Sequence, residues 1–148
     1  MGRLRVALNH GNRGLVGRDT TGETVGISVD LAREVASHLS LDVTFIRYDR
    51  AVEVSSTAQA DEWDLGFLAV DPARAATIAF TEPYVEIEGN YLAGPQSTAP
   101  DSAYLVASRL AVGTVIGTAY TLALPRLDGA EHLVIFRASW RLPELVPS

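Results

Sequence analysis

A short apolar segment that runs into an Asp-Pro pair is the feature that most constrains the fold of this chain. Residues 65–70 are apolar almost without interruption, which is typical of a strand buried on both faces of a sheet. Asp71 can cap a helix and Pro72 suits a first helical turn, so a short helix is predicted directly after the strand. After a second turn, residues 84–92 are predicted to form a long strand.

Arg74 would then lie in the first turn of that helix, beside backbone N–H groups that have no partner within the helix. A bound anion would satisfy those groups and balance the charge of the arginine. Because a guanidinium meets a carboxylate through two parallel hydrogen bonds, Arg74 and Asp71 predict a carboxylate-binding corner at the end of the strand. The alternative is that Arg74 is solvated, or is paired with Asp71 or Glu82.

Composition excludes several classes of function. All 12 basic residues are arginine and cysteine is absent, which removes Schiff-base lysines, P-loop lysines, disulfides and thiol nucleophiles. The net charge of −6 argues against a nucleic-acid-binding surface. The three histidines, His10, His38 and His132, are far apart in sequence, so no metal site is expected, and no cofactor is predicted.

The length of 148 residues fits one domain, or one domain and part of another. No apolar stretch approaches the roughly 20 residues that a membrane-spanning helix needs. Because the N-terminal residues enter a predicted strand at once, no signal peptide is expected in this chain. The expectation is therefore either a cytoplasmic protein or one from which a leader has been removed.

The first half of the sequence predicts a parallel α/β sheet. Residues 3–8 alternate as a strand does, and residues 42–48 are predicted to form a second strand. Between them lie an Asn- and Gly-rich loop at residues 9–16 and a turn at residues 19–22 that closes a short hairpin. Such a loop after a strand is either a ligand-binding edge or a plain turn.

A helix is predicted before the second strand, with Ser28 as its N-cap. Its core-facing stripe is expected to comprise Ile27, Leu31, Val35, Leu39, Ala32 and Ala36. The resulting strand–helix–strand unit favours a parallel sheet.

The second half of the sequence is less regular. A weak helix is predicted within residues 50–62, and Trp63 is expected to pack in the core. Residues 94–101 are rich in Pro, Ser and Gly and mark a boundary, so the predicted units are residues 1–93 and 94–148. The latter should contain strands at 110–115 and 132–136, a helix that Thr118 caps and Pro125 ends, and a poorly ordered tail at 138–148.

Three segments together resemble the family 3 extracellular solute-binding proteins, which have the periplasmic-binding-protein type II fold. They are RLRVALN, GETVGISVDLAREVASHL and EWDLGFLAVDPARAATIAFTEPYV. The resemblance covers about residues 3–92 well and continues weakly through VGTVIGTAY. It implies a first lobe and a partial second lobe, each an α/β layer with a mostly parallel sheet and flanking helices.

The resemblance also implies a function. The chain would be the substrate-binding component of an ABC importer and would capture a small carboxylate-bearing solute such as an amino acid. Its partner would be the permease in the membrane. The protein would be periplasmic, or extracellular and lipid-anchored, if a leader is removed.

Site residues follow from the resemblance position by position. Arg74 matches the arginine that holds the α-carboxylate of the ligand, and Gly117 and Thr118 match a helix start in the second lobe that closes on the same group. The other matching positions depart from the pattern, because Asn9 stands where an acidic residue is common, Asn12 near a usual aromatic, and Ala69 and Val70 where hydroxyl side chains are usual. Here the backbone would have to supply donors and acceptors.

Members of this family carry much more chain after this point. A chain that stops here would leave a sheet edge and apolar surface unpaired, which predicts a homodimer by strand exchange, a disordered C-terminal third or an apparent pseudo-domain. Three alternatives to transport are a ligand-sensing module, a truncated fragment that does not bind, and an enzyme similar to cyclohexadienyl (prephenate or arogenate) dehydratase. The enzyme is disfavoured, because Glu86, Glu88 or Asp71 would have to serve as a buried general acid.

Overall fold

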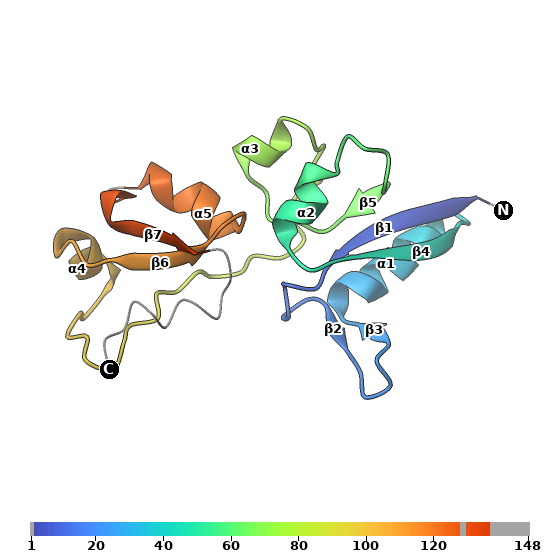
Figure 1. Cartoon of the computed structure of the whole chain (residues 1–148). Helices are drawn as coiled ribbons and strands as arrows, with labels where there is room; N and C mark the ends of the chain where they lie inside the picture. The colour runs from blue at the N-terminus through green and yellow to red at the C-terminus, as the bar shows by residue number, and fades with distance from the viewer. Residues whose placement is uncertain (1, 128–129, 137–148) are drawn as a thin grey trace. The chain divides into compact units, whose positions relative to one another are not determined.

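The computed structural model of the chain describes residues 2–127 and 130–136 (Figure 1). The chain divides into two compact units, a first unit, Met1–Phe80, and a second unit, Thr81–Ser148. The predicted boundary at residue 93 stays a prediction. The tail predicted to be poorly ordered, residues 138–148, lies outside the described residues.

The first unit is built on a three-stranded parallel sheet. Its strands are β1 (Arg3–Asn9), β4 (Asp42–Tyr48) and β5 (Leu65–Gly66), in the order β4-β1-β5. The pairing of β1 with β4 runs in register over seven positions and ends with Asn9 opposite Tyr48. The predicted strands at 3–8 and 42–48 and the predicted mostly parallel α/β architecture are confirmed.

Helices α1 (Ile27–His38) and α2 (Ala51–Ser56) cover opposite faces of this sheet (Figure 1). Alternate residues of β1 face α1, and they form the main core with one side of that helix. This core consists of Leu4, Val6, Leu8, Val16, Val29, Ala32 and Ala36. On the other face, the fully buried Val54 of α2 packs near Gly66 of β5. Each face of β1 is therefore covered, as a strand at the centre of a parallel sheet requires.

A hairpin precedes α1, as the turn signal predicts. Strands β2 (Gly17–Arg18) and β3 (Thr24–Val25) pair antiparallel. Between them, the carboxylate of Asp19 accepts hydrogen bonds from the backbone N–H of Thr21 at 2.8 Å and of Glu23 at 2.9 Å. This turn lowers the pKa of Asp19, chiefly through the hydroxyl of Thr21, because the bonds favour the charged carboxylate.

The start and the buried face of α1 both differ from the prediction. The helix begins at Ile27 after Gly26, not after Ser28, and Gly26 has a φ of 128°. A Cβ at Gly26 would lie 2.4 Å from the Leu15 carbonyl oxygen, so only glycine fits this entry. The buried residues are Ser28, Val29, Ala32 and Ala36, whereas Ile27, Val35 and Leu39 are exposed.

The difference lies in which side of the helix faces β1. Val29, Ala32 and Ala36 form the core with β1, whereas Val35, which has the same side chain as Val29, lies on the exposed side. The spacing of apolar residues predicts a helix, but here it did not identify which side of the helix is buried.

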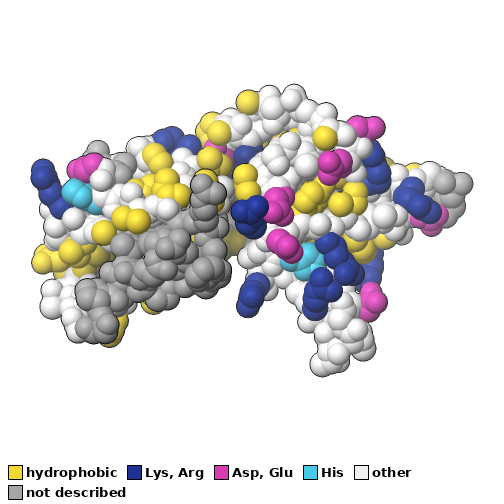
Figure 2. All heavy atoms as spheres, viewed as in Figure 1, with side chains coloured by type: hydrophobic (Ala, Val, Ile, Leu, Met, Phe, Trp, Pro, Cys, Tyr) yellow, Lys and Arg dark blue, Asp and Glu magenta, His cyan; other side chains and the backbone are white. Residues whose placement is uncertain are grey.

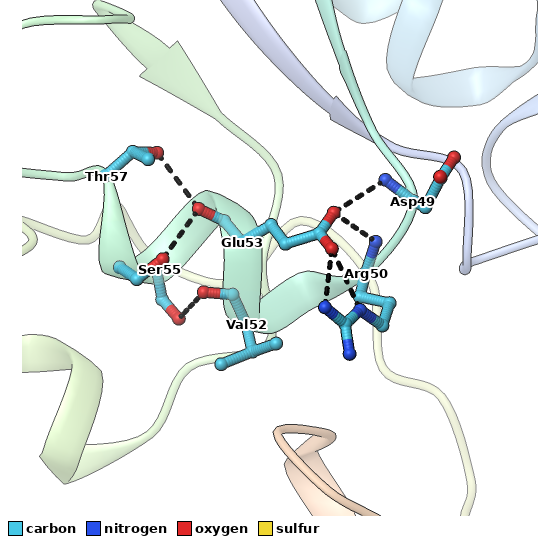
Figure 3. A network of polar contacts seen from close by, with 7 residues as sticks. Asp49, Arg50, Val52, Glu53, Ser55 and Thr57 are labelled. Atoms are coloured by element: carbon cyan, nitrogen blue, oxygen red, sulfur yellow. Dashed lines mark hydrogen bonds and ion pairs between the residues drawn. The ribbon is translucent and has the colours of Figure 1, made fainter. Parts of the chain in front are cut away.

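Helix α2 is shorter than the predicted segment at 50–62, and a network at its N-terminus explains where it begins (Figure 3). The carboxylate of Glu53 accepts hydrogen bonds from the backbone N–H of Asp49 at 3.0 Å and of Arg50 at 3.3 Å. It also accepts 2.7 and 2.9 Å bonds from the guanidinium of Arg50, which lowers the pKa of Glu53. Ser55 and Thr57 bond to backbone carbonyls behind them, and helical order ends there.

Two aspartates that precede β5 pair with Arg5 of β1, and these contacts are here called the Arg5 clamp. Arg5 of β1 bonds to Asp64 with its backbone N–H at 2.8 Å and with its guanidinium, and it also pairs with Asp61 at 2.7 Å. These contacts raise the pKa of Arg5 and lower that of Asp64. Next to them, Trp63 lies against Gly66 and donates its indole N–H to the Thr57 hydroxyl at 3.1 Å. It is half-buried and lies outside the main core, so the prediction of core packing is wrong.

The predicted strand at 65–70 is correct only for its first two residues, and these are half-buried, not buried as predicted. Beyond Gly66 the chain leaves the sheet, and Ala69 and Val70 are exposed, Val70 by 56%. The pairing with β1 stops at Gly66 although β1 continues to Asn9, so the apolar composition of the run does not by itself extend the strand.

The second unit contains a parallel pair, β6 (Val112–Val115) and β7 (Leu133–Phe136), which confirms both predicted strands in shortened form. Between them lie α5 (Ala119–Ala123) and two 3-10 turns, η1 (Leu124–Arg126) and η2 (Ala130–His132). Pro125 lies in η1, so α5 ends just before it, as predicted. Helix α4 (Ser102–Ala107) was not predicted.

The predicted long strand at 84–92 is wrong. Residues 81–101 contain neither helix nor strand, and all residues from 81 to 93 are exposed. Their alternation fits a strand, but a strand forms only against a partner, and within the described residues none pairs with this segment. No helix in the described part of the chain is long and apolar enough to cross a membrane.

Candidate functional site

The order of the strands indicates at which edge of the first unit a ligand would bind. From β1 the chain crosses to β4 on one side, and from β4 it crosses back to β5 on the other side of β1. In open parallel sheets, ligands bind outside the carboxyl ends of the strands where the chain direction reverses in this way. Here that position lies beyond the ends of β1 and β5, between the loop after Asn9 and the segment at 67–74.

Asp71 and Arg74 lie in this segment on α3 (Pro72–Ala75). The carboxylate of Asp71 accepts a 2.9 Å hydrogen bond from the backbone N–H of Ala73, which confirms the predicted cap. Both side chains are buried, with 4% of Asp71 and 5% of Arg74 exposed. The alternative of a solvated Arg74 is therefore wrong.

The guanidinium of Arg74 bonds back to the segment that precedes α3. Its Nη1 donates a 3.0 Å hydrogen bond to the backbone carbonyl of Ala69, five residues earlier. Burial lowers the pKa of Arg74, and the charge of the nearby Asp71 opposes that effect without cancelling it. Arg74 stays protonated at neutral pH, so the corner holds a buried positive charge.

Ala69 contributes its backbone to the corner. Its carbonyl binds Arg74, while its methyl group and the Val70 side chain are exposed beside α3. Neither side chain has a hydroxyl, so polar contacts at these positions come from the main chain.

Asn9 and Asn12 shape the loop at the end of β1. The Asn9 side-chain oxygen accepts a 3.0 Å hydrogen bond from the backbone N–H of Gly11, and its carbonyl accepts a 3.1 Å bond from that of Asn12. A Cβ at Gly11 would lie 2.8 Å from the Asp49 carbonyl, so the loop packs tightly on the end of β4. The side-chain oxygen of Asn9 thus closes the loop.

Gly117 and Thr118 lie in the second unit, at the start of α5. Gly117 has a φ of 76°, and the Thr118 hydroxyl accepts a 3.3 Å hydrogen bond from the backbone N–H of Thr121, which confirms the predicted cap. The same hydroxyl donates to the Val115 carbonyl at 2.8 Å. The predicted site residues therefore divide into five in the first unit and two in the second.

Sequence reasoning missed a set of basic side chains at the same edge of the first unit: His10, Arg18 and Arg47, here called the basic group. Burial lowers the pKa of His10, and the charges of Arg18 and Arg47 lower it further, while Asp49 raises it. Figure 2 shows a histidine beside basic side chains on the visible face of this unit. The signal was the alternation along β1, which places His10 on the same face as Leu8.

Two other expectations concern catalysis and metals. Glu86 and Glu88, the carboxylates considered as general acids, are exposed, and Asp71 is engaged as a helix cap. Among the described residues, no three His, Cys, Asp or Glu side chains gather as metal ligands.

Comparison with known proteins places these observations in context. Residues 4–137 match the family model for bacterial extracellular solute-binding proteins, family 3. A search of curated proteins found no match. The fold resembles that of an ancestral amino acid-binding protein described as a precursor of cyclohexadienyl dehydratase, with a TM-score of 0.77, 19% identity, and coverage of 98% of this chain and 66% of that one.

Two further solved structures are similar. One is a truncated, arginine-bound ArgBP from T. maritima, with a TM-score of 0.68, 23% identity, and coverage of 91% of this chain and 64% of that one. The other is a binding component of an ABC transporter from Wolinella succinogenes complexed with lysine, with a TM-score of 0.71, 20% identity, and coverage of 95% and 61%. The chain thus spans about two thirds or less of the length of these proteins, whose type II periplasmic-binding-protein fold it shares.

Proposed function

The chain belongs to the bacterial extracellular solute-binding proteins of family 3, and we propose that it binds a small carboxylate-bearing solute such as an amino acid. In this proposal it is the substrate-binding component of an ABC importer, with a membrane permease as its partner. It would act in the periplasm, or outside the cell on a lipid anchor.

The observation that carries the proposal is the buried cation at the switch point of the sheet. Arg74 is 5% exposed, and its pKa is lowered because burial outweighs the attraction of Asp71. Because most of the guanidinium is already removed from water in the free protein, an incoming carboxylate has less desolvation left to overcome at Arg74 than at a solvated arginine. The position beyond the carboxyl ends of β1 and β5 is where such a ligand would dock.

The remaining site residues support the same role. The backbone of residues 69–71 and the Asn9–Asn12 loop follow β5 and β1 at the same edge of the first unit. The role of Gly117 and Thr118 is proposed from the family resemblance alone. The similar solved structures are described as bound to arginine and to lysine, so an amino acid is the ligand class to test first.

A direct test is calorimetric titration of the chain with the standard amino acids and with acetate and succinate. We expect at least one carboxylate ligand to bind, and Arg74→Ala to weaken it about tenfold or more, since a hydrogen-bonded charge pair contributes about 1.5–3 kcal/mol. The control is Arg33→Ala, which removes an exposed arginine of α1 that is 3.7 Å from Asp30. Equal affinities for Arg74→Ala and the parent, with both folded, would refute the assignment.

One comparison favours an enzyme as the second candidate, because a similar structure is described as a precursor of cyclohexadienyl dehydratase. Against it, Glu86 and Glu88 are exposed, so burial does not prepare either one as a general acid. Incubation with prephenate and with arogenate, followed by ultraviolet absorbance of the products, distinguishes the two. Turnover that Glu86→Gln or Glu88→Gln abolishes would replace the binding role by a catalytic one.

A homodimer by strand exchange is also proposed. Residues 81–93 are exposed, and apolar side chains alternate with Glu86 and Glu88 along them, as in a strand awaiting a partner. Light scattering coupled to gel filtration measures the mass of the particle. A monomer at all concentrations would refute the exchange.

A further inference from the structure

The pairing of β1 with β4 places two members of the basic group, His10 and Arg47, on one face of the sheet. The β1–β4 ladder places Leu8 opposite Arg47, and it continues one residue past the strands, where the backbone N–H of His10 donates to the Tyr48 carbonyl at 2.8 Å. Because side chains alternate along a strand, His10 lies on the face of Leu8, and Arg47 lies on that same face. This is the face that α1 covers.

Arg18 joins them from the hairpin. It lies on β2 opposite Thr24 of β3, and its Nη1 donates to the Gly22 carbonyl at 3.2 Å, so its guanidinium is fixed near the turn. Both Arg18 and Arg47 depress the pKa of His10, which requires that their charges lie close to the imidazole.

Two buried polar atoms, one in His10 of the basic group and one in Thr24, the residue opposite Arg18, lack hydrogen-bond partners in the described part of the chain. Nε2 of His10 and the hydroxyl of Thr24 are both buried and form no hydrogen bond within the described residues. Thr24 itself is 5% exposed. An unsatisfied buried polar atom costs about 1–3 kcal/mol, so the Nε2 of His10 would gain a partner from a polar ligand that reaches the basic group.

The charge of the group selects the kind of ligand. The charges that act on His10 are two arginines and one carboxylate, Asp49, and in the described part of the chain neither Arg18 nor Arg47 forms a salt bridge. The neighbouring Glu53 is already engaged by Arg50. A cation would be repelled here, whereas an oxyanion would find both charge and hydrogen-bond donors.

We propose that His10, Arg18 and Arg47 form a second anion-binding site at the carboxyl edge of β1 and β4, which accepts a carboxylate or phosphate group. It is separate from Arg74, which follows β5 on the other side of β1. The oxyanion is either the second acidic group of a bound solute, a source that rests on the proposed function, or a free inorganic anion.

The first arm of the test uses inorganic phosphate alone, at constant ionic strength, and measures binding by calorimetry. We expect Arg47→Gln to weaken phosphate about tenfold, as the loss of about 1.4 kcal/mol implies. Arg47 is exposed, so this variant leaves the core intact. His10→Gln keeps a polar side chain and should weaken binding as well, whereas the control Arg33→Gln should bind as the parent does.

The second arm compares glutamate with glutamine, which have nearly the same shape and differ by one negative charge. If the solute supplies the oxyanion, the parent prefers glutamate, and Arg47→Gln and His10→Gln lower affinity for glutamate about tenfold while that for glutamine is unchanged. Arg74→Ala, in contrast, should weaken both ligands equally. This contrast separates failure of the second site from failure of the carboxylate corner.

The outcomes decide the proposal in every case. Phosphate binding that both variants lose supports the site with a free anion as its source, and a charge-dependent preference for glutamate that both lose supports the solute as its source. Phosphate and glutamate affinities that are undetectable in the parent, or that are the same in the parent and both folded variants, overturn the proposal.

Discussion

The two units differ most in how much of their apolar surface they cover. In the first unit, Val6, Leu8, Val29 and Val54 are fully buried between two helices and a sheet. In the described part of the second unit, Thr114 is the single buried residue, and Tyr91, Ile116 and Tyr120 are among many exposed large side chains. Both contain parallel strands. The difference shows that a parallel sheet becomes a core only where helices cover both of its faces.

The largest expected effect comes from truncating matched aliphatic side chains in the two units. Leu8→Ala should destabilise the first unit by about 2–5 kcal/mol, because its side chain is fully buried and the sheet cannot collapse onto the cavity. Ile135→Ala, at a strand position that is 51% exposed, should change stability by only about 0.5 kcal/mol. Urea unfolding followed by circular dichroism measures both. Equal effects would contradict this contrast in burial.

The next largest loss of stability is expected from replacing two glycines that have a positive φ, one in each unit. Gly26→Ala should cost more than about 2 kcal/mol, because alanine at a φ of 128° is strained and its Cβ would meet the Leu15 carbonyl. Gly117→Ala, at a φ of 76°, should cost only about 1–2 kcal/mol for the left-handed backbone. Thermal unfolding compares them, and a milder effect at Gly26 would contradict the close approach of α1 to its preceding loop.

Helix caps provide a third comparison. Asp71→Ala should cost about 1–2 kcal/mol, since the carboxylate both caps α3 and lies beside the buried charge of Arg74. Thr118→Ala should cost about 0.5–1 kcal/mol, because its cap bond is longer, at 3.3 Å, and only partly buried. Asp71→Asn keeps the cap without the charge and separates the two roles. Unfolding midpoints that fall equally in all three variants would contradict this ranking.

The smallest effect is a loss of stability in acid, which should be centred on the first unit. The pKa values of Asp64 and Glu53 are lowered by their pairs with Arg5 and Arg50. A lowered pKa stabilises the folded state above the unfolded value of about 4, and that contribution disappears as the pH falls through the folded value. Melting temperatures between pH 7 and pH 3 should therefore fall less steeply for Asp64→Asn than for the parent. An unchanged slope would show that the Arg5 clamp contributes nothing.

Local signals in the sequence were sufficient for several elements. Asp71 before Pro72, Thr118 after a glycine, and the Asp-Thr-Thr-Gly turn each act within a few residues, so their caps and hairpin could be predicted. The alternation at 3–8 and 42–48 also sufficed, because the two strands are partners in one sheet.

Elements that depend on a distant partner could not be predicted. Residues 84–92 alternate as well as any strand does, but no described residue pairs with them. The run after Gly66 is apolar enough for a strand, yet its pairing with β1 stops at Gly66. The same distinction applies to the candidate site residues. Arg74 could be predicted from the Asp-Pro turn beside it, whereas the basic group depends on the register between β1 and β4.

The contact of Trp63 with Thr57 and Gly66 gives the first unit an optical reporter of its own. Indole emission shifts to longer wavelength when the ring enters water, so separation of β5 from α2 will register as a red shift. The other tryptophan, Trp140, is outside the described residues and is removed by Trp140→Phe. In that variant the fluorescence of Trp63 alone reports on β5, the strand that leads to Arg74, and no label or dye is needed.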